Sequence, residues 1–129
     1  MKQRLTYFIS GHGDLTPEEF KAYYEDRIVL AAKEHANFIV GDFKGADTMA
    51  QDLLRELGGI VRIGVRVFHM FDKPRYLACP SFDTEGGFQS DAERDTAMTV
   101  SSDEDILWVR PGREKSGTAK NARRREEFV

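Results

Sequence analysis

Two short glycine-bearing segments of this sequence have the composition of loops that bind anions through their backbone. The first, Ser10-Gly11-His12-Gly13, follows an apolar run, and the second, Ser116-Gly117-Thr118, lies where a helix can begin. A helix start presents free N–H groups and the positive end of the helix dipole, and it commonly binds phosphate. The alternative is structural: a tight turn for the first segment and a helix cap for the second. We predict that both segments hold a phosphate group.

Arg94 is the charged residue whose position favours ligand binding most. It shares a helical face with Met98, and its guanidinium can bind a phosphate through two parallel hydrogen bonds. The alternative is an ion pair with a neighbouring carboxylate. The carboxylates considered are Asp91, Asp95 and Asp103.

A histidine and two aspartates are further candidates. His12 either donates to a phosphate or transfers a proton, or it is a solvated loop histidine. Asp42 can hold a ribose hydroxyl or position a water molecule, whereas Asp47 is expected to cap a helix. No metal is required, because His12, His35 and His69 are scattered without ligand spacing.

Composition and charge restrict the class of protein. The 129 residues suffice for one domain, 1–129, and the net charge of −3 lacks the basic excess of a general nucleic-acid binder. The single cysteine, Cys79, excludes an intrachain disulfide and favours a reducing compartment. No apolar run reaches membrane-spanning length, and the N-terminus does not resemble a signal peptide. We expect a cytoplasmic protein with neither nucleic acid nor membrane as partner.

Hydrophobic periodicity predicts an α/β fold. Apolar runs predict strands over residues 5–9, 38–40, 63–70 and 106–109, and helix-start signals occur near Thr16, Gly45, Ser90 and Ser116. Alternating strands and helices build a Rossmann-like parallel sheet with helices on both faces, for which we predict the strand order 3-2-1-4. Arg66 and His69 suggest a partly exposed edge for the third strand, and residues 71–89 are expected to form an irregular loop.

This topology predicts where a ligand binds. In such sheets, ligands occupy the crevice beyond the carboxyl ends of the strands, where the chain reverses direction between neighbouring strands. That point lies between the first and fourth strands, so the two glycine-bearing segments are expected to face each other across it.

Four motifs in this order resemble the SLOG superfamily, and its YspA-like branch in particular. The residues that carry the likeness are Ser10-Gly11-His12, Gly41-Asp42-x-x-Gly45-Ala46-Asp47, Arg94-Asp95-x-x-Met98 with Ser102-Asp103, and Pro111-Gly112 with Gly117-Thr118. The superfamily includes the LOG-type phosphoribohydrolases, which cleave cytokinin nucleotides, and sensor domains that bind ADP-ribose-like signals. The resemblance implies a Rossmann-like domain that binds a nucleotide or nucleotide-derived molecule, with no separate cofactor and often as a homodimer.

The sequence departs from the LOG pattern at a position that matters for catalysis. LOG enzymes carry a glutamate three residues after the glycine-threonine pair, whereas this chain has Asn121, which cannot serve as a carboxylate base or nucleophile. The loop before Gly117 is charged (Arg113-Glu114-Lys115), and Gly13 stands where related turns often have an arginine.

Three functions follow, and the first is favoured. It is binding of a nucleotide or nucleotide derivative. The second is N-glycosidic hydrolysis of a nucleoside monophosphate, in which Asp42, Asp95 or Asp103 supports an oxocarbenium-like centre while Arg94 holds phosphate. The third is a catalytically silent interaction subunit whose basic run, Arg123-Arg124-Arg125, is a contact face. Residues 71–89 are a candidate lid for either ligand-dependent function.

Overall fold

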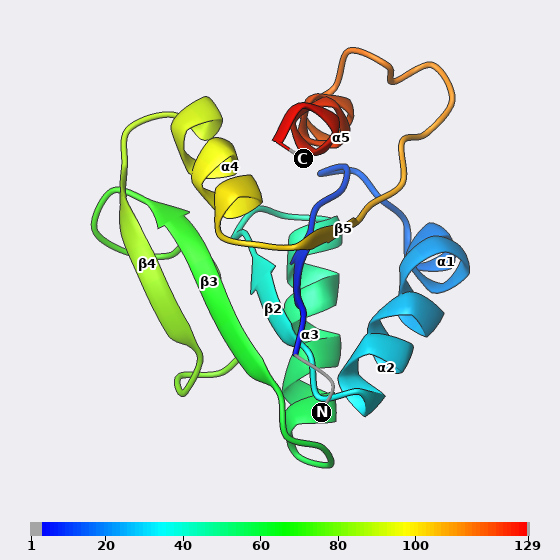
Figure 1. The fold of residues 1–129 in the computed structure, drawn as a ribbon, viewed down its shortest axis with the longest axis vertical. Coiled ribbons are helices and arrows are strands. Elements are labelled where there is room, and N and C mark those ends of the chain that lie inside the picture. The colour runs from blue at the N-terminus through cyan, green and yellow to red at the C-terminus, as the bar shows by residue number, and fades with distance from the viewer. Residues whose placement is uncertain (1–3, 129) are drawn as a thin grey trace.

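A computed structural model describes residues 4–128 as an α/β fold (Figure 1). The strands are β1 (Thr6–Ile9), β2 (Asn37–Val40), β3 (Gly64–Met70), β4 (Asp83–Phe88) and β5 (Glu104–Ile106). The helices are α1 (Pro17–Phe20), the π-helical turn η1 (Lys21–Glu25), α2 (Asp26–Lys33), α3 (Ala46–Gly58), α4 (Asp91–Val100) and α5 (Gly117–Phe128). Within this described part, no helix combines the length and apolar character needed to cross a membrane.

The five strands form one parallel sheet in the order β4-β3-β2-β1-β5. This confirms the Rossmann-like parallel sheet with helices on both faces. The four predicted strands correspond to β1, β2, β3 and β5, and they lie in the predicted order 3-2-1-4. The sheet also contains β4, which was not predicted and lies at the edge beside β3. β1 therefore lies between β2 and β5, and the segments that follow these strands lie together at the carboxyl edge of the sheet.

Three predictions about strands were wrong. β3 is not an edge strand, because β4 pairs with it and covers His69, which is buried. Residues 71–89 are not wholly irregular, because they contain β4, whose polar, glycine-containing sequence lacks an apolar signal. The last strand runs from Glu104 to Ile106 and not over residues 106–109, because the backbone N–H of Trp108 donates to the hydroxyl of Tyr24.

Each face of the sheet carries its own helical layer and apolar cluster (Figure 1). The larger cluster lies between the sheet and the helices α1, α2 and α3. Phe20, Tyr24, Ile28 and Ala31 belong to it, as their spacing predicts. Residues spaced four apart turn by about 40° more than a full turn at each step around an α-helix, so they gradually leave one face. The wider π-helical turn offsets this rotation and keeps these side chains on the face that packs against the sheet. The smaller cluster joins Phe8, Ile39 and Phe68 to Met98 of α4.

Side-chain caps confirm three of the four predicted helix starts, whereas α3 begins after Gly45 without a side-chain cap. Thr16 forms the complete capping box with Glu19 at the start of α1. Ser90 caps α4 by accepting from the N–H of Glu93, but the box is incomplete, because the Glu93 side chain accepts from the N–H of Gln89 instead. Ser116 caps α5, whose start lies at the carboxyl edge of the sheet.

Candidate functional site

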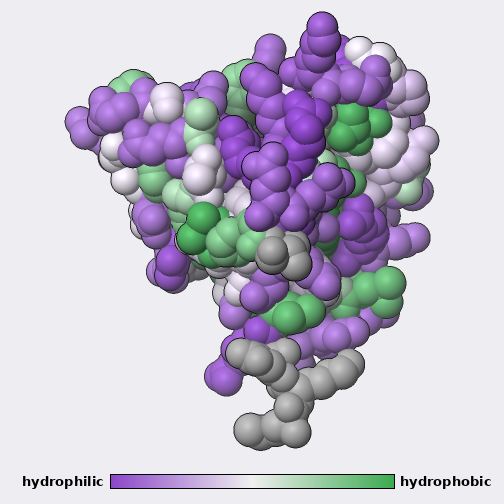
Figure 2. Space-filling view, turned by 45° about the horizontal axis from the view of Figure 1, so that its top comes forward, coloured by the Kyte–Doolittle hydropathy of each residue, from purple (hydrophilic) through white to green (hydrophobic). Residues whose placement is uncertain are grey.

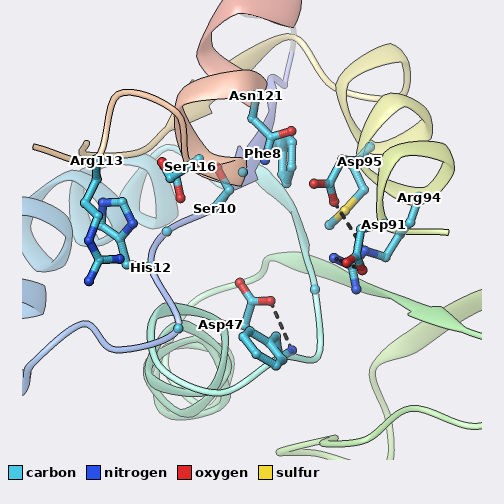
Figure 3. A pocket seen from close by; sticks show the side chains of 17 residues that line it. Phe8, Ser10, His12, Asp47, Asp91, Arg94, Asp95, Arg113, Ser116 and Asn121 are labelled. Carbon is cyan, nitrogen blue, oxygen red and sulfur yellow. Dashed lines mark hydrogen bonds and ion pairs between the residues drawn. The ribbon is translucent and has the colours of Figure 1, made fainter. Parts of the chain in front are cut away.

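A cavity of about 300 Å³ lies at the carboxyl edge of the sheet (Figure 3). Both glycine-bearing segments line it: the bend at residues 10–13 after β1 and the start of α5 at residues 116–118. Gly41, Arg94, Asp95 and Asn121 also line it. The structure thus brings together eleven of the sequence-predicted site residues, while Asp42, Gly45 and Asp103 lie outside the lining.

The bend after β1 is held from behind by Tyr24. The Tyr24 hydroxyl donates to the carbonyl of Ser10 at 2.7 Å and accepts from the N–H of Trp108 at 3.0 Å, which ties the bend to the segment after β5. Gly11 permits this close approach, because a Cβ atom there would lie 2.5 Å from the Tyr24 hydroxyl oxygen. The buried Oγ atom of Ser10 has no hydrogen-bond partner within the described residues. The hydrogen-bonding capacity of this hydroxyl is therefore unused in the structure.

Gly45 shapes the site without lining it. Its φ of 79° is left-handed, and a Cβ atom there would lie 2.5 Å from the carbonyl oxygens of both His12 and Gly13. The tight turn lets the N–H of Ala46 donate to the His12 carbonyl at 3.1 Å. The start of α3 is thereby fixed against the first bend.

The start of α5 supplies the opposite wall. The Oγ atom of Ser116 accepts from the N–H of Ala119 at 3.2 Å, while the N–H groups of Gly117 and Thr118 have no acceptor among residues 4–128. Thr118 and Asn121 are buried and line the cavity. The side-chain Oδ1 atom of Asn121 accepts from the Arg124 guanidinium at 2.6 Å. These donors and the helix dipole make this wall a favourable place for an anion.

His12 is not the solvated loop histidine considered from the sequence. Its ring is buried, and Nε2 accepts from the backbone N–H of Arg110 at 2.9 Å, which leaves the ring proton of the neutral form on Nδ1. Burial, together with the charge of Arg110, lowers the pKa of His12. The Arg110 guanidinium binds Glu19 through two hydrogen bonds and also binds Asp14. His12 therefore anchors the loop that precedes the start of α5.

Arg94 is on α4 and lines the side of the cavity that faces His12 and Arg113 (Figure 3). It is 8% exposed and lies 3.2 Å from Asp95, 3.4 Å from Asp91 and 3.6 Å from Asp42. The ion pairs with Asp91 and Asp95 confirm two of the alternatives considered from the sequence, whereas Asp103 is not a partner. The Nη1 atom forms the ion pair with Asp42 but no hydrogen bond within the described residues.

Asp42 and Asp103 do not reach the cavity. The buried carboxylate of Asp42 accepts from both the backbone N–H and the guanidinium of Arg75, at 2.6 and 2.8 Å. Burial raises its pKa, but these hydrogen bonds have the larger combined effect and lower it below the usual value. Asp103 lies at the amino edge of the sheet, where its carboxylate accepts from the N–H of Thr6 at 2.8 Å. Its position beside the start of β1 separates it from the ligand-binding edge.

Two carboxyl groups in the cavity have raised pKa values. Asp47, on the first turn of α3, is half-buried, and burial raises its pKa to about 7, although its Oδ2 atom accepts from the N–H of Phe43 at 3.1 Å. Burial also raises the pKa of Asp95, against the opposing effect of Arg94. A carboxyl group that titrates near neutral pH can take up or release a proton under physiological conditions. Asp47 is therefore not the helix cap predicted from the sequence, because the N-cap residue of α3 is Gly45 and the helix has no side-chain cap.

The charged side chains of the cavity are divided between two sides, with Arg113 on one and two aspartates with Arg94 on the other. Arg113, His12 and Ser116 lie together on one side in Figure 3, with Asp91, Arg94 and Asp95 on the other. Hydrophilic side chains also predominate on the upper part of the surface shown in Figure 2, where apolar residues form small, separate patches. This arrangement suits a ligand with an anionic group at one end and hydroxyl or amino donors at the other.

Sequence reasoning missed four lining residues: Phe8, Phe43, Asp91 as a cavity residue, and Arg113. Phe43 directly follows the Gly41-Asp42 pair of the second motif, so its position in the sequence could have indicated that it lies at the site. Arg113 comes from an irregular loop whose position depends on its 2.6 Å ion pair with Asp14. No periodic signal marks such a contact.

No group of histidine, cysteine, aspartate and glutamate within residues 4–128 is arranged to hold a metal ion. Searches with protein-family models, curated proteins and solved structures find no match to this chain. Membership of the SLOG superfamily thus remains a prediction from the motifs.

Proposed function

We propose that this protein binds a small phosphorylated molecule of the nucleotide class, with its phosphate between the two glycine-bearing segments. The observation that carries the proposal is the convergence, on one cavity, of donor groups that lack a hydrogen-bond partner. The buried Ser10 Oγ and Arg94 Nη1 atoms have no hydrogen-bond partner in the described part of the chain, and Nη1 lies 3.6 Å from Asp42. The free N–H groups of Gly117 and Thr118 are at the same cavity. Because buried unsatisfied donors destabilise a fold, a ligand that accepts from them would be bound favourably.

The size and charge of the cavity favour a mononucleotide. At about 300 Å³, the cavity lies at the lower end of the range for small-molecule sites. A phosphate at the start of α5 would face Arg113, while sugar hydroxyls would face the carboxylates of Asp47 and Asp95. Three aspartates in the lining disfavour a triphosphate. The motifs that resemble the SLOG superfamily agree with this ligand class.

Hydrolysis of the N-glycosidic bond is the second candidate. The observation in its favour is that Asp47 and Asp95 both line the cavity and both have raised pKa values. A protonated carboxyl can assist departure of a base, and an ionised one can stabilise the oxocarbenium-like sugar or activate water. Asn121 cannot provide this chemistry, so these aspartates would have to replace the glutamate of the LOG enzymes.

The interaction-subunit alternative has less support. Arg125 is largely buried and binds Asp105 and the Ser102 carbonyl, and Arg124 binds Asn121. These contacts stabilise the fold and occupy two of the three arginines of the basic run, which leaves Arg123 as the exposed one.

A thermal-shift panel tests the proposal. Nucleoside monophosphates, ADP-ribose, cyclic nucleotides and inorganic phosphate are each added to the purified protein. A ligand at 100 times its Kd adds about 2.7 kcal/mol of stability, and we expect the nucleoside monophosphates to give the largest shift. No shift with any of these compounds would contradict the proposal. Chromatography of the same mixtures tests hydrolysis, since release of free base that is lost in Asp47→Asn or Asp95→Asn would establish it.

A further inference from the structure

Phe43 is an exposed aromatic residue in the lining of the cavity. It lies between β2 and α3, and it is 42% exposed. The other phenylalanine of the lining, Phe8, is 1% exposed and belongs to the core cluster beneath α4. The stacked pair Tyr23 and Trp108 does not line the cavity. Among the described residues that line the site, Phe43 is thus the phenylalanine with a ring available to a ligand.

The ring of Phe43 is held in place from several directions. A Cβ atom on Gly13 would lie 2.5 Å from Cε2 of Phe43, so the ring edge rests directly on the first bend. The guanidinium carbon of Arg75 lies 5.1 Å from the ring centroid. The N–H of Phe43 donates to Asp47. A ring fixed in this way loses little conformational entropy when a ligand stacks on it.

The surroundings of the ring are cationic and accessible. The Arg75 guanidinium is already bound to Asp42, so it stays against the ring as a fixed backing. The Lys44 ammonium lies 5.8 Å from the ring centroid on an exposed side chain, which an incoming planar group can displace. Cations near an aromatic ring also favour an approaching ligand that carries phosphate.

We propose that Phe43 is the platform on which the nucleobase of the ligand stacks, and that it gives the site its preference for nucleotides over sugar phosphates. This inference rests on the proposed function, because it assumes that the phosphate lies between the two glycine-bearing segments. Gly13 contacts the Phe43 ring and belongs to the bend that receives the phosphate. The base would then lie at the rim of the cavity and the phosphate inside it. Aromatic stacking tolerates different bases, because every base has a π-face.

Calorimetric titration with AMP and with ribose 5-phosphate measures how much the base contributes to the binding affinity, because the two compounds differ by the base. For the wild-type protein, we expect AMP to bind about 5- to 150-fold more tightly than ribose 5-phosphate, the range that one stacked base supplies. Phe43→Ala should abolish this difference by weakening AMP alone, and Phe43→Tyr should restore it. Phe128→Ala is the matched control, because Phe128 is 49% exposed and lies outside the cavity lining.

Each outcome has a distinct meaning. Equal weakening of AMP and ribose 5-phosphate by Phe43→Ala would overturn the stacking role, since that pattern indicates a general structural effect. Unchanged AMP affinity in Phe43→Ala would overturn it as well, while leaving phosphate binding intact. If the wild-type protein binds neither compound, both this inference and the proposed function are wrong.

Discussion

The Nε2 atom of His12 accepts a hydrogen bond from the backbone N–H of Arg110, 98 residues further along the chain, at 2.9 Å. This bond joins the bend after β1 to the loop that leads into α5. The two walls of the cavity are therefore linked directly and not only through the sheet. Because the bond requires an unprotonated Nε2 atom, the geometry of the site depends on pH.

His12 should make the folded state less stable in acid. Its folded-state pKa is lowered by burial and by Arg110, so its contribution is present above the unfolded value of about 6.5 and is lost as the pH falls below it. His12→Gln keeps an acceptor near Nε2 but does not titrate. Denaturant unfolding at pH 7.5 and pH 5.5 should show a smaller loss of stability for this variant than for the wild type. An equal loss in both proteins would contradict the assignment.

Asp47→Asn should stabilise the protein at high pH. The folded-state pKa of Asp47 is raised to about 7, so the stability associated with its protonated form is present below the unfolded value and is lost as the pH rises through 7. Since the side chain also faces solvent in the cavity, we expect a gain of only about 1 to 2 kcal/mol at pH 8 and none near pH 4. The exposed Asp72→Asn is the control. A variant less stable than wild type at pH 8 would count against this explanation.

Arg94→Gln should destabilise the fold far more than loss of a surface ion pair. Removing the guanidinium leaves the largely buried Asp95 carboxylate without its partner and takes one cation from the buried Asp42, at a cost of about 3 to 5 kcal/mol. Arg66→Gln is the matched comparison, because the Arg66–Glu85 pair is about half exposed on both sides, and its loss should cost about 0 to 1 kcal/mol. Urea unfolding measures both, and similar values would refute the buried-pair interpretation.

Gly45→Ala should destabilise the protein by about 2 kcal/mol or more. The substitution places a Cβ atom against two carbonyl oxygens at a left-handed φ of 79°, which breaks the contact between α3 and the first bend. Gly58→Ala, in the last turn of α3, meets no atom within 4 Å and should stabilise by up to about 1 kcal/mol. Melting temperatures of the two variants should move in opposite directions. Movement in the same direction would show that the Gly45 turn relaxes freely.

Thr118→Asp should abolish any nucleotide-dependent thermal shift. It places a negative charge at the free N–H groups of α5, where the phosphate is proposed to bind. Thr118→Val, which keeps the shape and adds no charge, should retain most of the shift, and circular dichroism verifies folding of both variants. An unchanged shift in Thr118→Asp would move the phosphate site elsewhere.

The parts of the fold with a strong local signal were predictable. The apolar runs at residues 5–9 and 38–40, the capping box at Thr16 and the helix start at Ser116 all depend on neighbouring residues. β4 was missed because its polar sequence is stabilised by pairing with β3 and by packing of His69 against Gly86. Those contacts are tertiary and leave no periodic pattern.

The site was predictable in outline but not in detail. The glycine-bearing bends are local features, and the parallel topology brings them together. The partner of Asp42 could not be predicted, because Arg75 comes from an irregular segment 33 residues away. The raised pKa of Asp47 depends on burial by surrounding elements. Long-range packing therefore determines the chemical properties of individual site residues.

A crystal structure of the protein grown with saturating AMP tests the central claim most directly. The account predicts a phosphate within hydrogen-bond distance of the N–H groups of Gly117 and Thr118, facing the bend at residues 10–13. Nucleotide bound elsewhere on the molecule, or an empty cavity under saturating conditions, would contradict it.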